Sequence, residues 1–443
     1  MKKRFLSLGL AAVMAMSLTA CGGSNTAETT KAAETTAADA KAEGSEAADT
    51  AATDAGAAGG VFKIGGIGPV TGGAAVYGVA VQHGAELAVK EINEAGGING
   101  AQIEFNFQDD EHDAEKSVNA YNTLKDWGMQ VLMGTVTSAP CIAVADKTAA
   151  DNMFQITPSG SAVECAANPN VFRICFSDPD QGAASAKYIG ENKLASKVAV
   201  IYDSSDVYSS GIYEKFAEES ANQGIEIVAA EAFTADSNKD FSTQLQKAKD
   251  AGAELVFLPI YYTEASLILQ QASTMGFAPQ FFGCDGMDGI LQVQNFDTKL
   301  AEGLMLLTPF AADATDDLTV KFVESYKAAY NEVPVQFAAD AYDAIYAIKA
   351  AIEDANVTPD ADASTICDAL KASMLNIKLD GLTGEGMTWT EDGEPHKAPK
   401  AVKVVDMGRT PLSRSYIRLL DATPQARVLT NNADLPAAKE LMK

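Results

Sequence analysis

The chain has few basic residues and almost no histidine, and each shortage excludes a class of function. Of its 443 residues, 33 are Lys or Arg and 60 are Asp or Glu, so the formal net charge at pH 7 is −27. A surface this acidic repels phosphate backbones, which excludes nucleic acid as a partner. The 3 histidines form no H-E-x-x-H pair, and there is no G-x-S-x-G elbow. We therefore expect a protein that is not an enzyme and needs no cofactor.

The sequence also lacks the patterns of a metal site. There is no CxxC pair and no zinc spacing. The acidic cluster at 109–113 (DDEHD) lacks the spaced oxygens and the glycine bend of a calcium loop. We interpret this cluster as a solvated turn after a strand, and we expect no metal.

The first residues predict a lipoprotein signal peptide, residues 1–20. A basic start (KKR) precedes an apolar run, Phe5 to Thr19, which is shorter than the ~20 residues of a membrane-spanning helix. The sequence LTACG at 18–22 is similar to a bacterial lipobox, so Cys21 is the expected site of lipid attachment. The alternative is an ordinary secreted protein with a chance cysteine. The remaining cysteines are interpreted as small buried apolar residues, with their pairing left open.

Residues 21–60 are expected to be the lipidated cysteine and a disordered tether. From Ser24 to Gly60 the residues are almost all Ala, Thr, Glu, Asp, Gly or Ser, without an aromatic side chain. Such a segment buries too little apolar surface to fold. The expected location is therefore the outer face of the bacterial cytoplasmic membrane, with the folded part extracytoplasmic and lipid-anchored.

From Val61 to about Thr308, short apolar strands alternate with segments of helical length. This alternation predicts an α/β fold with mostly parallel, doubly wound sheets. The predicted strands are Phe62–Ile67, Gln102–Gln108, Gln130–Met133, Phe154–Thr157, Lys197–Tyr202, Glu226–Ala230, Leu255–Pro259, Gln280–Phe282 and Gly303–Leu307, with later ones near Met387–Thr390 and Ala401–Val405. The predicted helices are Ala74–Ala95, Ala114–Trp127, Ala139–Asp151, Asp180–Asn192, Tyr208–Asn222, Phe241–Ala251 and Glu264–Met275, followed by a helical region from Asp316 to Asp354.

The first strand runs into a glycine-rich loop that suggests a nucleotide site. In the dinucleotide fingerprint, the third glycine of G-x-G-x-x-G opens a helix. Here it falls one place late, at Gly72, and Pro69 removes an N–H that a pyrophosphate would need. The loop is therefore not expected to bind a nucleotide.

An ordered set of motifs resembles the leucine/isoleucine/valine-type periplasmic binding proteins, which serve ABC transporters. The resemblance runs from about Phe62 to Val405. The motifs are GPVTG at 68–72, YG at 77–78, GAELAVKEIN at 84–93, GGING at 96–100, DD at 109–110, GTVTS at 134–138, ITP at 156–158, FR at 172–173 with DQG at 180–182, KDF at 239–241 and ADAYDA at 339–344.

The resemblance implies a two-lobed type I periplasmic-binding-protein fold, with the lobes joined by a multi-strand hinge. Lobe 1 would comprise residues 61–177 and 308–383, and lobe 2 residues 178–307 and 384–407. Four of the six arginines lie after Met407, and residues 408–443 depart from the family pattern. We interpret 408–443 as a poorly ordered tail, with a frameshift or read-through as one hypothesis for its origin.

The resemblance also implies a site for a free amino acid between the lobes. Ser138 would donate to the ligand carboxylate, and Ser159 and Ser161 would contact the ligand from the next loop. The competing interpretations are a plain N-cap serine and an ordinary polar loop. A known cysteine pair of some relatives is absent, because Thr137 and the 109–113 loop carry no cysteine.

The remaining implied ligand contacts are one acid and three tyrosines. Asp285 takes the place of the family's glutamate and would bind the ligand ammonium; a turn aspartate is the competing interpretation. The tyrosines are the cleft residues Tyr77, Tyr208 and Tyr261, with Tyr262 as a substitute for Tyr261.

The implied partners are a free amino acid, most simply a branched-chain or aliphatic one, and the subunits of an ABC permease. The chain is expected to be a monomer. The alternative function is a sensor module of the same fold for another small metabolite, such as an amide, urea or an aromatic acid, because one fold serves both roles.

Overall fold

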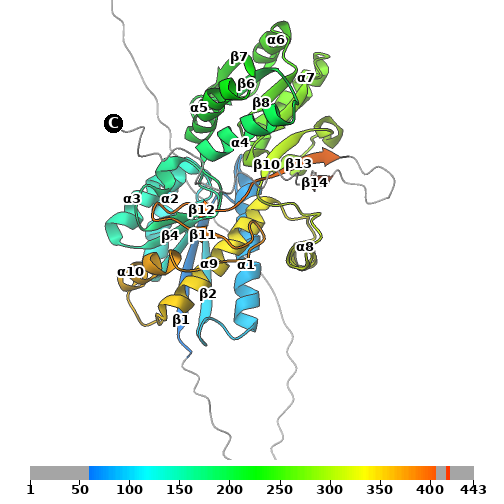
Figure 1. Ribbon diagram of the computed structural model, residues 1–443. Helices are drawn as coiled ribbons and strands as arrows, with labels where there is room; N and C mark the ends of the chain where they lie inside the picture. Colours follow the sequence, from blue (N-terminus) through cyan, green and yellow to red (C-terminus); the bar gives the residue numbers. More distant parts are fainter. Residues whose placement is uncertain (1–58, 406–415, 420–443) are drawn as a thin grey trace, which may run out of the picture. The chain divides into compact units, whose positions relative to one another are not determined.

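The computed structural model describes residues 59–405 and 416–419. In these residues, two main sheets are each covered by helices (Figure 1), which confirms the predicted α/β class. The predicted signal peptide, Cys21 and nearly all of the tether lie outside the described residues, as does most of the 408–443 tail.

The first sheet is entirely parallel, with the strand order β2-β1-β3-β4-β5. Its strands are β1 (Val61–Gly68), β2 (Gln102–Asp109), β3 (Val131–Gly134), β4 (Phe154–Thr157) and β5 (Val171–Arg173). Its helices are α1 (Ala75–Glu94), α2 (Ala114–Trp127), α3 (Ser138–Asp151), α9 (Gln336–Ala355) and α10 (Ala363–Met374). Successive side chains of a strand point to opposite faces. Val131 and Met133 of β3 therefore join the core that contains α1 and α9, whereas Leu132 joins the core that contains α2 and α3.

The second sheet has the order β14-β13-β10-β9-β8-β6-β7 and is parallel except at β13 and β14. Its strands are β6 (Lys197–Asp203), β7 (Glu226–Phe233), β8 (Leu255–Leu258), β9 (Gln280–Gly283), β10 (Met305–Thr308), β13 (Lys400–Val405) and β14 (Tyr416–Leu419). Its helices are α4 (Asp178–Glu191), α5 (Val207–Asn222), α6 (Ser242–Asp250) and α7 (Tyr262–Thr274). Strand β14 lies within the predicted tail, and it pairs antiparallel with β13.

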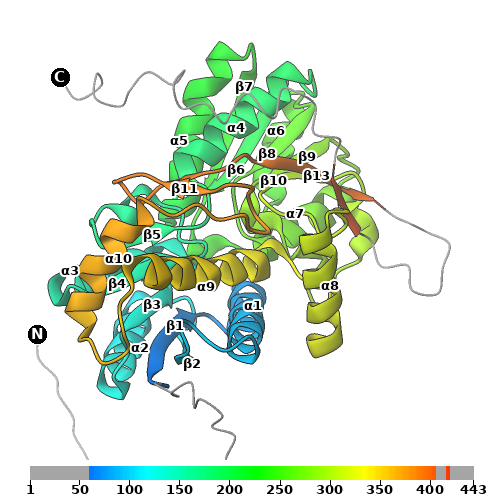
Figure 2. The same ribbon diagram turned by 60° about the horizontal axis from the view of Figure 1, so that its bottom comes forward.

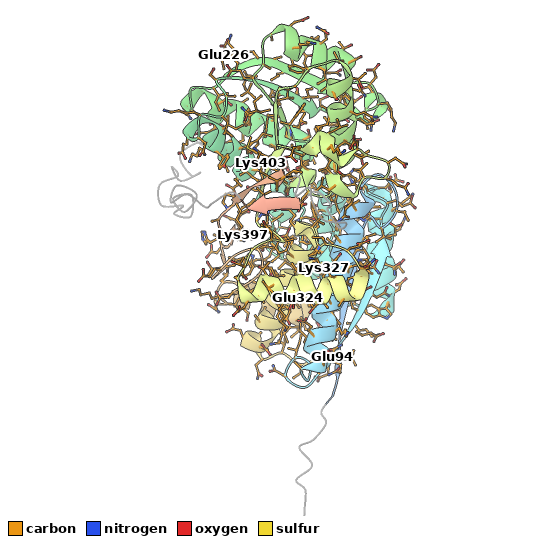
Figure 3. All side chains as sticks on the ribbon, turned by 90° about the vertical axis from the view of Figure 1, so that its right-hand side faces the viewer. Glu94, Glu226, Glu324, Lys327, Lys397 and Lys403 are labelled. Atoms are coloured by element: carbon orange, nitrogen blue, oxygen red, sulfur yellow. The ribbon has the colours of Figure 1, made fainter. Side chains whose placement is uncertain are left out.

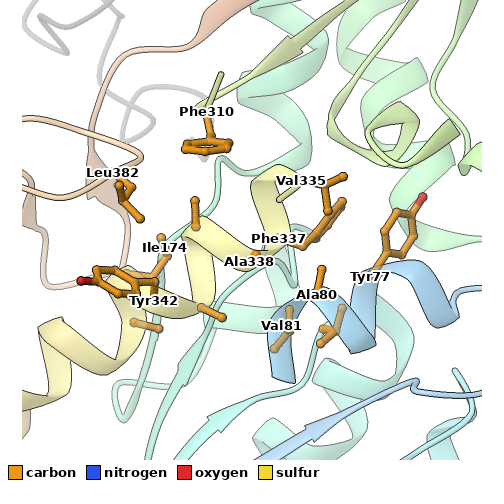
Figure 4. Close-up of a cluster of buried hydrophobic side chains, with 14 of the residues drawn as sticks. Tyr77, Ala80, Val81, Ile174, Phe310, Val335, Phe337, Ala338, Tyr342 and Leu382 are labelled. Atoms are coloured by element: carbon orange, nitrogen blue, oxygen red, sulfur yellow. The ribbon is translucent and has the colours of Figure 1, made fainter. Parts of the chain in front are cut away.

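Helices α1 and α9 pack closely against each other (Figure 2). Gly84 of α1 makes this contact possible, because a Cβ there would lie 2.0 Å from the carbonyl oxygen of Ala338 in α9. Figure 4 shows Ala80 and Val81 of α1 close to Ala338 and Phe337 of α9. This packing fixes the first turn of α9, and hence Phe337, close to Tyr77 of α1.

The chain passes between the two sheets three times: after β5, after β10, and between β12 (Pro395–His396) and β13. Helix α8 (Asp317–Tyr330) follows the second crossing. The strand expected near Met387–Thr390 is β11 (Thr388–Trp389), which pairs with β12 in a separate two-stranded sheet rather than joining the second sheet.

Buried charges hold the crossing segments together. The side chain of Lys397, labelled in Figure 3, is fully buried and forms an ion pair of 3.4 Å with Asp340 of α9. Its ammonium also donates to Thr383 Oγ1 at 3.0 Å. Arg173, at the end of β5, is equally buried and forms an ion pair of 3.2 Å with Glu394. The two cations thus connect residues on either side of β12, Glu394 and Lys397, to elements of the first sheet.

Candidate functional site

The seven side chains predicted to bind a ligand all line one small cavity. They come from α1, α3 and α5, the residue before α7, the loop after β4 and the turn after β9. The cavity measures about 10 Å³, which is room for about one water molecule. Its predicted lining residues are Tyr77, Ser138, Ser159, Ser161, Tyr208, Tyr261 and Asp285.

Ser138 is the first residue of α3, directly after the β3 turn. Its Oγ accepts hydrogen bonds from the N–H groups of Ser161 at 3.3 Å and Ala162 at 3.1 Å. With two bonds accepted, the hydroxyl has its proton left to donate. The N-cap position belongs to Thr137, so the interpretation of Ser138 as a plain N-cap serine is wrong.

Ser159 and Ser161 lie on the loop that follows β4. The Ser159 hydroxyl donates to the carbonyl oxygen of Val136 at 2.7 Å, which ties this loop to the start of α3. The Arg173 guanidinium holds the same loop by donating to the carbonyl oxygens of Gly160, Ser161, Ala162 and Val163 at 2.6 to 3.3 Å. A buried arginine therefore fixes the shape of the loop.

Asp285 follows β9 and faces the cavity from the second sheet. Tyr208 Oη donates to Asp285 Oδ1 at 2.7 Å and accepts from the N–H of Gly286 at 3.0 Å. The Asp285 N–H donates to the side-chain oxygen of Gln181 at 3.2 Å. Burial raises the pKa of Asp285 to about 6, although the Tyr208 hydroxyl favours the ionised form.

The three lining tyrosines pack against one another beside the cavity. Tyr208 and Tyr261 are stacked with ring centroids 4.8 Å apart, and Tyr77 meets Tyr261 edge-on at 5.5 Å. The Tyr77 hydroxyl donates to the carbonyl oxygen of Gly286 and accepts from the Tyr262 N–H. Tyr262 lies outside the cavity, where its hydroxyl accepts from the N–H of Val76 at 3.2 Å. Of the two tyrosines, Tyr261 lines the cavity and its substitute Tyr262 does not.

Four lining residues were not predicted from the sequence. They are Val136, Thr137, Gly286 and Phe337. Thr137 and Gly286 directly adjoin predicted site residues and Val136 is two positions from Ser138, so their place after β3 and β9 was the available signal. Phe337 has no such signal, because it reaches the cavity only through the packing of α9 on α1.

A second, larger cavity lies on the other side of Tyr261. It measures about 300 Å³, and its lining includes His112, Asp203, Asp206 and Glu264. Burial raises the pKa of Asp206 to about 6 and lowers the pKa of His112. His112 Nδ1 is 2.8 Å from Thr137 Oγ1.

The acidic cluster at 109–113 is a turn after β2, but it is not fully solvated as predicted. Asp110 is 0 % exposed, and burial raises its pKa to about 7. Asp109 binds the glycine-rich loop, because its carboxylate accepts from the Val70 N–H at 2.9 Å and from the Thr71 hydroxyl at 2.6 Å. The Val70 N–H and the Thr71 hydroxyl of the glycine-rich loop therefore donate to Asp109.

The described residues contain neither a cluster of metal-binding side chains nor a disulfide. No cluster of three or more His, Cys, Asp or Glu side chains there could hold a metal ion. The cysteines of this part of the chain are buried and free, which confirms their interpretation as small core residues: Cys141, Cys165, Cys175, Cys284 and Cys367. Among the same residues, no helix has the length and apolar character needed to cross a bilayer.

Two helix-covered, mostly parallel sheets, three crossing segments and a buried cavity between the sheets define the fold of the type I periplasmic binding proteins. The family model described as "Periplasmic binding protein" matches residues 61–409, and the chain belongs to this family. The resemblance in the sequence motifs is thereby confirmed.

Relatives of known name match most of the chain. Leu/Ile/Val-binding protein homolog 3 of Brucella melitensis is 33% identical over 304 residues, which cover 68% of this chain and 81% of that protein. The leucine-, isoleucine-, valine-, threonine- and alanine-binding protein of Pseudomonas aeruginosa is 30% identical over 318 residues, covering 71% and 83%.

A solved structure gives the same result for the fold. The branched-chain amino acid transporter substrate-binding protein of Streptococcus pneumoniae, in complex with isoleucine, matches with a TM-score of 0.71. It is 28% identical, and the match covers 81% of this chain and 99% of that one.

Proposed function

We propose that the protein captures a free amino acid in the cavity lined by Ser138 and Asp285 and delivers it to an ABC permease. The observation that supports this proposal is that one cavity is lined both by Ser138, whose hydroxyl proton is free to donate, and by the buried acid Asp285. An amino acid is a zwitterion, so its two charged groups need these two opposite kinds of partner.

The carboxylate of the ligand would bind at the N-terminus of α3. The first N–H groups of a helix lack partners within the helix, and the helix dipole favours an anion there. Ser138 adds a hydroxyl whose oxygen is already occupied by two N–H groups. A carboxylate at this position would receive the hydroxyl proton at a favourable helix end.

The ammonium of the ligand would bind at Asp285. Its carboxylate is buried, and burial opposes the ionised form unless a cation arrives. The Tyr208 hydroxyl holds one of its oxygens at 2.7 Å, which fixes the orientation of the acid. A ligand ammonium would favour the ionised form and make a charge-assisted hydrogen bond.

The side chain of the ligand would lie among aromatic and aliphatic groups. The rings of Tyr77, Tyr261 and Phe337 and the side chain of Val136 provide apolar walls. Apolar walls without a further charged group favour an aliphatic side chain. The names of the relatives from Brucella melitensis and Pseudomonas aeruginosa support the same ligand class.

Ligand entry requires the two lobes to separate, because the cavity has room for about one water. We propose that the lobes are 61–177 with 308–383 and 178–307 with 384–407, and that they move about the crossing segments. The bonds that would break on opening include those that the Tyr77 hydroxyl makes with Gly286 and Tyr262. The bonds from Val76 to Tyr262 and from Thr263 to Gly73 also cross between the proposed lobes.

The proposed place of action is the outer face of the cytoplasmic membrane, with Cys21 as the lipid attachment site. The membership of a periplasmic family supports an extracytoplasmic location. Mass spectrometry of the N-terminal peptide from the native protein tests the anchor: a diacylated Cys21 is expected. An unmodified Cys21, or a mature chain that begins elsewhere, would contradict it.

A thermal-shift screen of the purified protein tests the ligand class. The panel should contain the standard amino acids together with amides, urea and aromatic acids. A ligand at 100 times its dissociation constant stabilises the folded state by about 2.7 kcal/mol. We expect the largest shifts from leucine, isoleucine and valine. A shift only from another class of metabolite would refute the proposed function.

A further inference from the structure

Helix α9 begins without a cap from its own sequence. Its N-cap residue is Val335, whose side chain makes no capping hydrogen bond, and its first turn contains no acidic residue. The first N–H groups of a helix have no partners within the helix, and the helix dipole favours an anion beside them. Because the first turn of α9 is buried, its N–H groups need an acceptor from elsewhere in the chain.

Asp288 supplies this acceptor from a segment 48 residues earlier in the chain. Its Oδ2 accepts from the N–H of Gln336, the first residue of α9, at 2.7 Å. The side-chain oxygen of Gln336 accepts in turn from the Thr308 hydroxyl at 2.6 Å. Asp288 is 3 % exposed and Gln336 is 1 % exposed, so both bonds are shielded from water. The start of α9 is therefore fixed through the backbone and through a side chain.

The Asp288 carboxylate is only half satisfied in this position. Among the described residues, its second oxygen, Oδ1, has no hydrogen-bond partner. Burial raises the pKa of Asp288 to about 7; the Gln336 N–H opposes this rise, and the Asp285 carboxylate adds to it. A half-satisfied buried carboxylate is costly, whereas a serine or aspartate at position 335 would cap α9 locally. The stability of α9 alone therefore does not explain Asp288.

Asp288 lies on the same turn as the acid of the proposed amino-acid site. Its N–H donates to the carbonyl oxygen of Asp285 at 2.8 Å. Beyond the capped N–H, α9 continues from Gln336 to Phe337, which lines the cavity with its ring centroid 4.3 Å from that of Tyr77 (Figure 4). Asp288 does not line the cavity itself. One side chain thus connects a turn of one proposed lobe to an apolar wall that the other lobe contributes.

We propose that Asp288 is a positioning residue for the size of the ligand side chain: by capping α9 from the opposite proposed lobe, it holds Phe337 against a large aliphatic side chain. The side chain of leucine would reach this ring, whereas the methyl group of alanine would not. Without the cap, the first turn of α9 can move, and only large ligands lose a contact. This inference rests on the proposed function and deepens it by naming a residue that selects among amino acids.

The test compares leucine with alanine, which share the same charged groups and differ in the size of the side chain. Calorimetry measures the affinity of each for the full chain, purified in detergent, as the wild type and as Asp288→Ala. We expect leucine to bind the variant about 10-fold more weakly, since a cap and an apolar contact each carry about that factor. The affinity for alanine should change less than about 3-fold. Equal weakening of both ligands would overturn the assignment.

Asp316→Ala is the matched control, because it removes the cap of another helix. Asp316 Oδ1 accepts from the N–H of Thr319 at 2.9 Å at the start of α8, and neither residue lines the cavity. This variant should leave the ratio of the two affinities unchanged. Asp288→Asn keeps an acceptor for the Gln336 N–H and should keep the ratio within about 3-fold of the wild type. A ratio as low in Asp288→Asn as in Asp288→Ala would contradict the role of the cap.

A double-mutant cycle tests whether Asp288 acts through Phe337. Phe337→Ala should reduce the preference for leucine over alanine by a similar factor. Adding Asp288→Ala to it should have little further effect on this preference, because the two residues would act together. Full additivity of the two substitutions would overturn the assignment.

A second measurement needs no ligand. Amide hydrogen exchange of the ligand-free chain reports the bond between Gln336 and Asp288 directly. The Gln336 N–H should exchange at least about 10-fold faster in Asp288→Ala than in the wild type or in Asp316→Ala. Unchanged exchange at Gln336 would overturn the assignment. Failure of the wild type to bind any amino acid would overturn the proposed function while leaving the exchange result intact, which separates the two outcomes.

Discussion

Arg173 donates from Nη1 to the carbonyl oxygen of Ser161 at 2.6 Å, and this bond fixes the loop that forms one wall of the site. The same guanidinium reaches three further carbonyls of the loop and forms an ion pair with Glu394. A planar group with five donors suits such a task, whereas lysine presents a single point charge.

We expect Arg173→Lys to destabilise the protein by about 3 kcal/mol, because it leaves buried carbonyls and a mostly buried carboxylate unpaired. Urea unfolding measures this change. The control is Lys125→Met, which removes an ion pair of 2.6 Å with Asp151 between partly exposed side chains. That control should cost less than about 1 kcal/mol. Similar losses in the two variants would contradict the role given to Arg173.

Tyr77→Phe should weaken amino acid binding about 10-fold. The substitution removes the hydroxyl that bonds both the carbonyl oxygen of Gly286 and the N–H of Tyr262. Calorimetry with leucine measures the effect. Tyr202→Phe is a suitable control, because Tyr202 stacks on Tyr213 and neither ring lines the cavity. Unchanged affinity in Tyr77→Phe would show that this hydroxyl does not hold the site together.

Amino acid binding should become stronger as the pH rises through about 6. The pKa of Asp285 is raised to about 6 by burial, and only the ionised form attracts an ammonium. At pH 5 about one tenth of the sites would be ionised, so affinity should be about 10-fold lower than at pH 7.5. Asp285→Asn should bind weakly at both values and remove most of the pH dependence. A wild-type affinity that falls as the pH rises from 5 to 7.5 would refute this assignment.

The free energy of unfolding of the ligand-free protein should fall as the pH rises, whereas the affinity for an amino acid should increase. Burial raises the pKa of Asp110 to about 7, above the ordinary 3.8. A raised pKa contributes stability that is complete below the ordinary value and is lost as the pH rises through 7. We expect this residue to cost about 2 kcal/mol of unfolding free energy between pH 5 and 8.

Urea unfolding at the two pH values measures the loss, and Asp110→Asn should reduce it. Asn keeps an acceptor for the His112 N–H, which Asp110 Oδ1 binds at 3.0 Å. The exposed Asp360 has its pKa lowered by a hydrogen bond to Thr358, so Asp360→Asn should not reduce the loss. If Asp110→Asn retains the full loss of stability, the pH dependence arises elsewhere.

Most of the residues that line the cavity could be selected from the sequence because several of them stand at strand ends. Ser138, Ser159 and Asp285 each follow a buried strand, and the carboxyl ends of parallel strands meet at one edge of a sheet. Short buried strands between helices are a strong local signal, which is why the α/β class could also be predicted. Strand position alone does not say which part of a ligand each residue would bind; those expected roles came from the resemblance to the family motifs.

Features that depend on packing between distant segments were missed. Helix α10 was not predicted, although Asp362 caps it and Ile366, Leu370 and Met374 recur on one face. Phe337 could not be selected from its own helix, because nearly every residue in the first half of α9 is buried.

The Tyr77 hydroxyl has one oxygen that is both donor and acceptor across the cavity, to Gly286 and from Tyr262. Both partners lie on the side of the cavity opposite Tyr77, so one side chain of α1 holds two backbone groups on the other side. If the proposed lobes separate, the closed form loses both bonds through the movement of this one residue. A single-molecule distance measurement across the cavity, made with the wild type and with Tyr77→Phe, should therefore find the variant open more often than the wild type.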